Sequence, residues 1–297
     1  MTKVNLRISF EMDKTAKVKH VISKILAYTF LILMAALCLF FFYILIVNST
    51  KDKSELIGAY TPTFGTSFFK NFWNALTSPG NSYLNIPLGL LNSFIVASLT
   101  AVVTTYFSAL TAYAVHAYDF KGKTFVATFI LAIMMIPSQV TSLGFIRIAY
   151  ELQLTNYLFM LILPTIAAPS VYFYMLQYLK ATLPLDLVEA SRMDGSSEFM
   201  TFNRIVLPIM KPALAVQAIF SFVQSWNNYY MPSLLLKDST KHTLPIMLGL
   251  LRSQQESQAD AGQVWMVILI SILPVVLVYL VLSKSIIKGV TSGSVKG

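Results

Sequence analysis

Residues 180–212 read KATLPLDLVEASRMDGSSEFMTFNRIVLPIMKP and form a charged segment between two long apolar runs. The segment holds eight acidic and basic residues, which are Lys180, Asp186, Glu189, Arg192, Asp194, Glu198, Arg204 and Lys211. The flanking runs, at approximately 157–178 and 213–236, hold none. Because the chain keeps so many charges at one defined place between apolar runs, we interpret the segment as a docking element for a separate, soluble partner.

The overall composition is that of a membrane protein. The 297 residues are 56% hydrophobic and 12% charged, with a mean hydropathy of +0.66, whereas a soluble domain carries about 25% charged residues. A helix needs about 20 apolar residues to cross a bilayer. Six runs without Asp, Glu, Lys or Arg are long enough, at approximately 27–47, 94–115, 124–146, 157–178, 213–236 and 264–282. Membrane-spanning strands are shorter and alternate in polarity, so the sequence predicts an all-α, polytopic protein with six transmembrane helices.

The net charge of +9 indicates membrane topology and not nucleic-acid binding. With the N-terminus placed inside, fifteen of the 22 basic residues fall in the inner segments and seven in the outer ones. Loops on the cytoplasmic side are enriched in Lys and Arg. The distribution therefore favours six spans with both termini in the cytoplasm.

The chain divides into an inner N-terminal segment (1–20), a six-span membrane domain (21–289) that contains the charged loop 181–212, and a C-terminal tail (290–297). Residues 48–85 form the longest outer segment. Within it, apolar residues recur at helical spacing, at Phe68, Phe69, Phe72, Trp73 and Leu76. This pattern predicts a short helix that either lies in the membrane interface or packs against the outer ends of the spans.

Prolines interrupt two consecutive spans. Pro137 lies near the middle of the third, and Pro164 and Pro169 lie in the fourth. A proline inside a helix removes a backbone hydrogen bond and bends the helix. Bent spans suit a protein that must change shape, although purely structural kinks would give the same pattern.

Polar side chains gather on one face of the predicted fifth span. They recur at i, i+4, i+7, i+8 and i+11, as Gln217, Ser221, Gln224, Ser225 and Asn228. Amides are costly in hydrocarbon unless they are paired, so this face is expected to meet another helix or water. Amides and hydroxyls beside aromatic rings suit a neutral, hydroxyl-rich solute such as a sugar, which predicts a substrate pathway. Hydrogen bonding between helices is the alternative for each of these residues.

The charged segment carries the signals of two short helices joined by a turn. Asp186, with Glu189 three residues on, predicts an N-terminus of the capping-box type. Gly195 can adopt the left-handed conformation that ends a helix. A second helix is expected from about Ser196, with one side formed by Phe199, Phe202 and Ile205. The two helices would make a compact knob with one apolar face to insert into a groove.

This segment resembles the cytoplasmic signature of the membrane-spanning subunits of bacterial ABC importers, which reads Glu-Ala-Ala, Asp-Gly and then Ile-x-Leu-Pro. The matching residues are Glu189, Ala190, Ser191, Asp194, Gly195, Phe202, Ile205, Leu207 and Pro208. Ser191 stands where the family has alanine, a small-for-small change. The resemblance implies a type I ABC importer permease fold, in which these residues form the coupling helices that dock into a cleft of a cytoplasmic ATPase.

Three further features look like the sugar-importing branch of the family, and most like its maltose-type second permease. They are Ser225-Trp226-Asn227 with Pro232, Thr243-Leu244-Pro245, and the ending at residues 288–297. The resemblance therefore implies uptake of a disaccharide, an oligosaccharide or a glycoside. The tail of this branch can reach the ATPase dimer, a role carried over to residues 291–297.

The resemblance also implies the partners. These are a second, homologous permease in a heterodimer, two cytoplasmic ATPase subunits and an extracytoplasmic solute-binding protein, in the bacterial cytoplasmic (inner) membrane. The chain itself would hold no catalytic residue, metal or cofactor, since ATP and Mg²⁺ would bind the ATPase. ATP binding would close the ATPase dimer, and the coupling helices would move with it and switch the bent spans between inward- and outward-facing states.

Other classes fit the residues less well. Ion-coupled secondary transporters place ionisable residues within their spans, whereas the six runs hold no Asp, Glu, Lys or Arg. An intramembrane enzyme is disfavoured because the sequence has no HExxH, paired carboxylates or metal-ligand cluster. Gly122-Lys123-Thr124 looks like the end of a phosphate-binding loop, but Ala117 stands where that motif needs a glycine. An ABC importer permease for peptides, polyamines or phosphonates is the nearest alternative.

Overall fold

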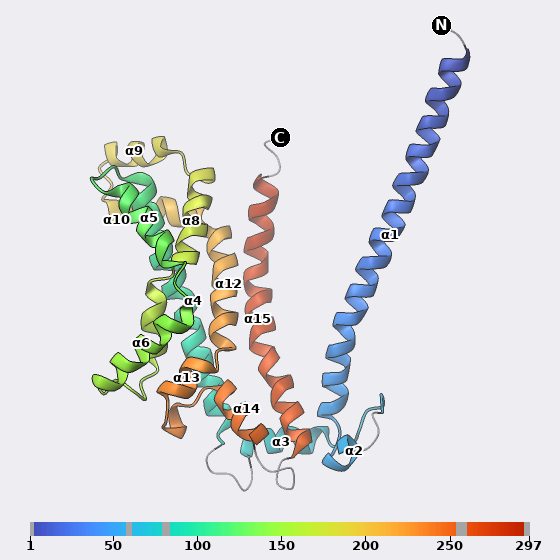
Figure 1. The fold of residues 1–297 in the computed structure, drawn as a ribbon, viewed down its shortest axis with the longest axis vertical. Coiled ribbons are helices and arrows are strands. Elements are labelled where there is room, and N and C mark those ends of the chain that lie inside the picture. The colour runs from blue at the N-terminus through green and yellow to red at the C-terminus, as the bar shows by residue number, and fades with distance from the viewer. Residues whose placement is uncertain (1–2, 58–60, 79–83, 254–259, 294–297) are drawn as a thin grey trace.

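The computed structural model describes residues 3–57, 61–78, 84–253 and 260–293, with the side chains of residues 3–15 and 284–293 left out. Its helices in chain order are α1 (Lys3–Ser49), α2 (Lys53–Ile57), α3 (Phe68–Thr77), α4 (Ile86–Ala117), α5 (Lys123–Ile133), α6 (Ser138–Glu151), α7 (Phe159–Ile162), the 3₁₀ helix η1 (Leu163–Ile166), α8 (Pro169–Thr182), α9 (Leu185–Met193), α10 (Glu198–Thr201), the π-helix η2 (Phe202–Val206), α11 (Leu207–Ile209), α12 (Lys211–Trp226), α13 (Tyr230–Leu235), the 3₁₀ helix η3 (Ser239–Lys241), α14 (Leu244–Ser253) and α15 (Ala261–Gly293). Over the described ranges no residue lies in a strand. The all-α prediction is confirmed (Figure 1).

Three helices are long and apolar enough to cross a membrane alone, namely α1, α4 and α15. Three bent pairs bring the possible crossings among the described residues to six. They are α5 with α6, α7–η1 with α8, and α10–α11 with α12, bent by 93°, 44° and 82°. Five of these agree with predicted spans, whereas the pair of α10–α11 with α12 starts in the charged segment, and within it only α12 lies in the predicted fifth span.

Helix α4 is the centre of the bundle, with α12 and α8 packed along it. Its buried face is lined by small residues, among them Ala97, Ala101, Thr104 and Ser108. Small side chains let helix backbones approach closely in a bilayer, where the hydrophobic effect does not drive association between helices. The close packing of α4 follows from this composition.

The third span is two helices and not one kinked helix, which corrects the single run predicted at 124–146. Helix α5 ends at Ile133, and the backbone NH groups of Met134 to Ile136 bond three residues back in a tight turn. Pro137 then takes an extended conformation (φ −56°, ψ 127°), and α6 starts at Ser138. Proline cannot donate the hydrogen bond that would continue α5, so the chain turns by 93° there.

The run predicted as the fifth span is also divided. Helix α12 ends at Trp226, and α13 begins only at Tyr230. The predicted outer loop 238–261 contains a further apolar helix, α14. The break falls at the polar pair Asn227-Asn228, which the prediction had included in a single span.

The two ends of the molecule differ in what they carry. Helices α9 and α10 lie at one end, together with the N-terminal end of α1 and the described C-terminal end of α15 (Figure 1). Helices α2, α3 and α14 lie at the opposite end. The charged segment is therefore on the side opposite α2 and α3, as the six-span topology requires.

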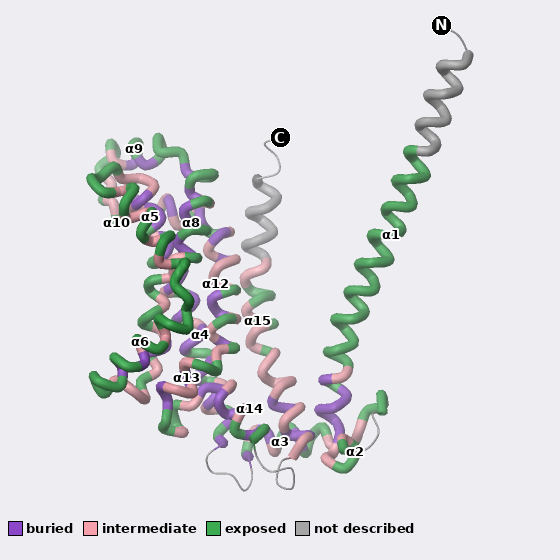
Figure 2. Tube along the Cα trace, viewed as in Figure 1, coloured by how far each residue is buried: buried purple, intermediate pink, exposed green. Residues whose placement is uncertain are grey.

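Helix α1 runs unbroken from Lys3 to Ser49, so the backbone has no boundary at residue 20. Its side chains are exposed from Ala16 to Phe42, and burial begins only near Leu45, beside α15 (Figure 2). Most of this apolar helix is thus not covered by the chain's own helices.

The predicted short helix at residues 68–77 is present as α3. Its aromatic side is open, since Phe69 and Trp73 are 82% and 65% exposed. Asn71 on the opposite side is buried and donates through Nδ2 to the carbonyls of Ser49 (2.9 Å) and Lys51 (2.8 Å). The polar side packs against the protein, so the exposed aromatic side matches the interfacial alternative.

Candidate functional site

The charged segment (residues 181–212), from here on called the coupling loop after the role expected for it, begins with a helix whose start differs from the prediction. Pro184 is the N-cap of α9 and no side chain caps the helix, so the capping box of Asp186 and Glu189 is wrong. Pro184 sets the extended backbone (φ −64°, ψ 135°) from which α9 starts at Leu185. Asp186 therefore lies inside the first turn, where its charge favours the positive end of the helix dipole.

The turn after α9 depends on Gly195, as predicted. Its φ of +79° lies in the left-handed region, which residues with a Cβ atom adopt at a cost. The NH groups of Asp194, Gly195 and Ser196 bond back to carbonyls of α9 and close the helix end. No atom lies within 4 Å of where a Cβ would stand, so Gly195 faces open space outside the chain.

The second short helix also forms, as α10. Ser197 caps it by accepting a hydrogen bond from the Met200 NH (3.4 Å). Inside the hairpin, the Ser191 hydroxyl donates to the Val188 carbonyl (2.8 Å) and lies 3.1 Å from the Thr201 hydroxyl. Ser191 and Thr201 are both buried. These contacts hold α9 and α10 together as one unit.

An ion pair crosses the turn and continues to α4. Arg192 Nε donates to Glu198 Oε1 (2.7 Å), and the Tyr113 hydroxyl of α4 donates to Glu198 Oε2 (3.1 Å). The Arg192 guanidinium lies 5.3 Å from the centre of the Tyr118 ring, within reach of a cation–π interaction. The hydrogen bond from Arg192 holds the pKa of the Glu198 carboxyl below its ordinary value of 4.5. We call Tyr113, Tyr118, Arg192 and Glu198 the clamp.

A buried aromatic contact lies beneath the clamp. Phe202 is fully buried, and its ring centre is 5.6 Å from those of both Tyr106 and Tyr113 on α4. At the other end of the loop, His116 Nε2 lies 3.2 Å from the Leu183 carbonyl oxygen. The coupling loop is thus attached to α4 at several points.

The signature residues divide between the two sides of the loop. Those exposed are Glu189, Ala190, Asp194, Gly195 and Pro208. Ile205 and Leu207 are partly buried, whereas Ser191 and Phe202 are buried against the chain itself. The structure therefore leaves the first group free to contact another protein and gives Ser191 and Phe202 an internal packing position.

Two exposed apolar residues extend this free surface. Met193 is 88% exposed and Phe199 is 69% exposed, one on each side of the Gly195 turn. Phe199 was expected on the same side as Phe202, but it is exposed, whereas Phe202 is buried against α4. Met193 was not predicted. Its exposure could have been predicted from its position on α9, on the side opposite Val188 and Ser191.

The polar face of α12 is only partly open. Gln224 is exposed and has no hydrogen-bond partner among the described residues, whereas Gln217 is partly buried and Ser221 buried. An exposed amide within an apolar bundle requires water or a partner on that side.

Two other members of the predicted polar face have partners within the chain. The Ser225 hydroxyl donates to Thr100 Oγ1 of α4 at 3.5 Å. Asn228 lies beyond the end of α12, so it is not on the predicted helical face, and its Oδ1 accepts from the Met231 NH at the start of α13 (3.3 Å). The Ser225 contact joins two helices, as in the hydrogen-bonding alternative, whereas the Asn228 contact is local to its own segment.

Comparison with known proteins identifies the family and the fold of the chain. Residues 105–286 match the family described as binding-protein-dependent transport system inner membrane component. The chain is 34% identical to the arabinooligosaccharides transport system permease protein AraQ of Bacillus subtilis, over 90% of this chain and 94% of that protein. It is 32% identical to the trehalose/maltose transport system permease protein MalG of Thermococcus litoralis, over 94% and 99%. A bacterial ABC transporter involved in import of the acidic polysaccharide alginate has a chain of the same fold, with a TM-score of 0.73, 20% identity, and 88% and 96% coverage.

Proposed function

Because the chain belongs to the family of binding-protein-dependent transport system inner membrane components, we propose that it is one permease subunit of an ATP-driven ABC importer for a sugar. The observation that supports this most is the coupling loop. It presents Glu189, Asp194 and Gly195 at one end of the bundle while its inner side is fixed to α4. Such an element can transmit a movement from a protein outside the membrane to the helices within it.

The partners follow from what the chain leaves uncovered. A cytoplasmic ATPase would bind the exposed side of the coupling loop and would hold the ATP and Mg²⁺, so the permease catalyses no bond chemistry. A second, homologous permease would cover apolar surface such as that of α1. A solute-binding protein would deliver the sugar at the opposite end, beside α3 and α14. Both termini would then be cytoplasmic, in the bacterial inner membrane.

The sugar as solute is supported by the relatives named for arabinooligosaccharides and for trehalose and maltose. The candidate class is a disaccharide, oligosaccharide or glycoside. An importer permease for a non-sugar solute is the alternative. An ion-coupled carrier is disfavoured, because the predicted spans carry no acidic or basic residue.

The test is uptake by the complete importer in proteoliposomes. The solutes are maltose, trehalose, lactose, raffinose, α-1,5-arabinotriose and an alginate oligosaccharide, each with ATP inside or absent. ATP-dependent uptake of at least one sugar is expected. Uptake of none, or uptake that follows an ion gradient without ATP, overturns the proposal. Glu189→Gln, at an exposed carboxylate, is expected to lower uptake per ATP hydrolysed, whereas Asp186→Asn on the same helix is the matched control.

Gln224 tests the pathway on α12. Gln224→Ala should change sugar uptake at unchanged assembly, since this exposed amide has no structural partner in the described chain. Ser225→Ala serves as the comparison, because it removes a contact with Thr100 and should chiefly lower thermal stability. Unaltered uptake in Gln224→Ala removes that residue from the pathway.

A further inference from the structure

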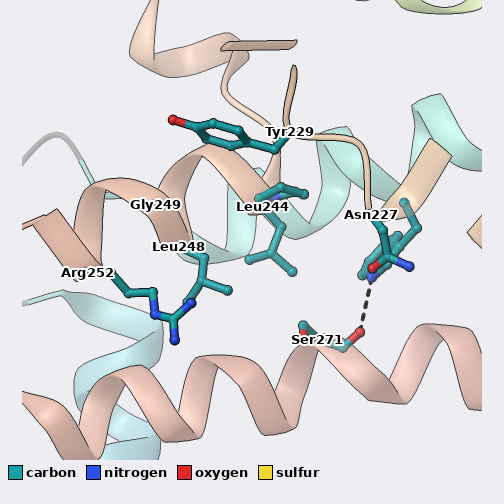
Figure 3. Close-up of a pocket in the computed structure, with 9 residues that line it drawn as sticks. Asn227, Tyr229, Leu244, Leu248, Gly249, Arg252 and Ser271 are labelled. Carbon is teal, nitrogen blue, oxygen red and sulfur yellow. Dashed lines mark hydrogen bonds between the residues drawn. The ribbon is translucent and has the colours of Figure 1, made fainter. Parts of the chain in front are cut away.

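A pocket of about 360 Å³ lies where α12 ends, at the end of the molecule opposite the coupling loop. The end of α12, the turn before α13, helix α14 and the middle of α15 surround it (Figure 3). Its volume is at the lower end of the range of small-molecule sites, about 300–1,000 Å³. None of the polar residues of α12 discussed above is among the residues that line it.

One wall of the pocket is apolar and held in place. The Trp226 ring is buried and stacks on Phe222, with ring centres 5.7 Å apart and planes 15° apart. Its Nε1 donates to the Ser271 carbonyl on α15 (3.1 Å). Leu244 and Leu248 of α14 continue this wall. A rigid apolar wall can receive one face of a ligand without loss of side-chain freedom.

The polar part of the pocket lining consists of three groups without partners. Asn227, the Tyr229 hydroxyl and Arg252 all line the pocket, and none forms a side-chain hydrogen bond or ion pair within the described residues. Arg252 lies on one side of Leu248 and Leu244, and Asn227 lies on the other (Figure 3). Together they offer amide, hydroxyl and guanidinium donors around an apolar wall, whereas no carboxylate is among the lining residues.

The position of Tyr229 depends on a glycine. Its ring is 54% exposed and lies over α14 at Gly249 (Figure 3). A Cβ at Gly249 would be 3.1 Å from Tyr229 Cε2, closer than ordinary contact. Glycine thus lets the ring lie close against α14, where Tyr229 is one of the residues that line the pocket.

We propose that this pocket is a subsite for one saccharide unit of the transported solute, an inference that rests on the proposed function. A sugar ring has apolar C–H faces and a rim of hydroxyls. The Trp226 and Tyr229 rings can pack against the C–H faces of the sugar. The free donors of Asn227 and Arg252 can bond to its hydroxyl groups. The absence of lining carboxylates disfavours a cation, and the position at the end opposite the coupling loop places the pocket where solute enters.

The experiment measures equilibrium binding of a radiolabelled sugar to the complete importer in nanodiscs without the binding protein. The sugar is whichever of the six solutes the wild-type importer takes up. Tyr229→Ala and Arg252→Gln are expected to weaken binding about threefold to tenfold each, the loss of one or two polar or ring contacts. Tyr230→Ala, a neighbouring exposed tyrosine that does not line the pocket, should bind within about twofold of wild type.

Gly249→Ala separates binding from folding. Alanine favours a helix over glycine, so thermal stability should hold or rise while the displaced Tyr229 ring weakens binding. If wild type binds the sugar and Tyr229→Ala, Arg252→Gln and Gly249→Ala bind it equally well, the subsite is refuted and the proposed function stands. If wild type takes up sugar but binds none without the binding protein, the subsite is also refuted. If it takes up none of the six solutes, the proposed function fails and the saccharide occupant fails with it.

Discussion

The clamp predicts that Glu198→Gln loosens the coupling loop without unfolding the bundle. The substitution removes the charge that accepts hydrogen bonds from Arg192 (2.7 Å) and Tyr113 (3.1 Å). Both charged side chains are partly exposed, so the ion pair is worth about 0.5–1 kcal/mol. The bond from the Tyr113 hydroxyl adds about 1 kcal/mol. The expected loss in local stability is therefore about 1–2 kcal/mol.

The assay is hydrogen–deuterium exchange over residues 185–201 of the assembled importer in nanodiscs. A loss of this size should raise the exchange rate of these amides about 5- to 30-fold, with little change in α4. Asp186→Asn is the control, because this carboxylate on α9 has no ion pair or side-chain hydrogen bond among the described residues. Equal exchange in Glu198→Gln and wild type, or an equal rise in Asp186→Asn, refutes the reasoning. In a double-mutant cycle, Glu198→Gln and Tyr113→Phe should be coupled by at least about 0.5 kcal/mol.

The same contacts predict a dependence on pH. Because Arg192 lowers the pKa of Glu198 in the folded loop, the stabilisation is complete above the ordinary value of 4.5 and is lost as the pH falls below it. Exchange corrected for its intrinsic rate should therefore be unchanged from pH 7 to pH 5 and should rise at lower pH. A rise between pH 7 and pH 5 that Glu198→Gln abolishes would contradict this sign.

Three further substitutions test the packing. Gly195→Ala should destabilise the loop by about 1 kcal/mol, because φ is +79° there, and Gly195→Asn should recover part of this in the same exchange assay. Asn71→Ala removes two buried hydrogen bonds, costs about 2–3 kcal/mol and should lower the Tm in nanodiscs by several degrees; an unchanged Tm would mean that α3 does not hold the end of α1. Gly262→Ala would put a Cβ 2.5 Å from the Lys51 carbonyl oxygen and should lower the Tm, whereas Gly144→Ala meets no atom within 4 Å and should not; equal Tm values for the two variants would count against this packing.

The sequence by itself determined the features that depend on neighbouring residues. Runs of about 20 apolar residues predict membrane helices because every backbone polar group must be satisfied within the segment. A glycine after a short charged helix predicts a left-handed turn, and Gly195 has one. The signature around Glu189 and Pro208 placed the coupling loop, and with it the family. Each of these signals is contained in a window of about 20–30 residues.

Only the tertiary structure decided how distant segments meet. The third span turns by 93° at Pro137, and proline alone indicates a bend but not its angle, which depends on the helices around it. Phe202 is buried against α4 while Phe199 is exposed, because the position of α4 decides which side of the loop is covered. Glu198 accepts a hydrogen bond from Tyr113, which lies 85 residues earlier in the sequence. Such contacts depend on the paths of several helices at once, and no local pattern of polarity specifies those paths.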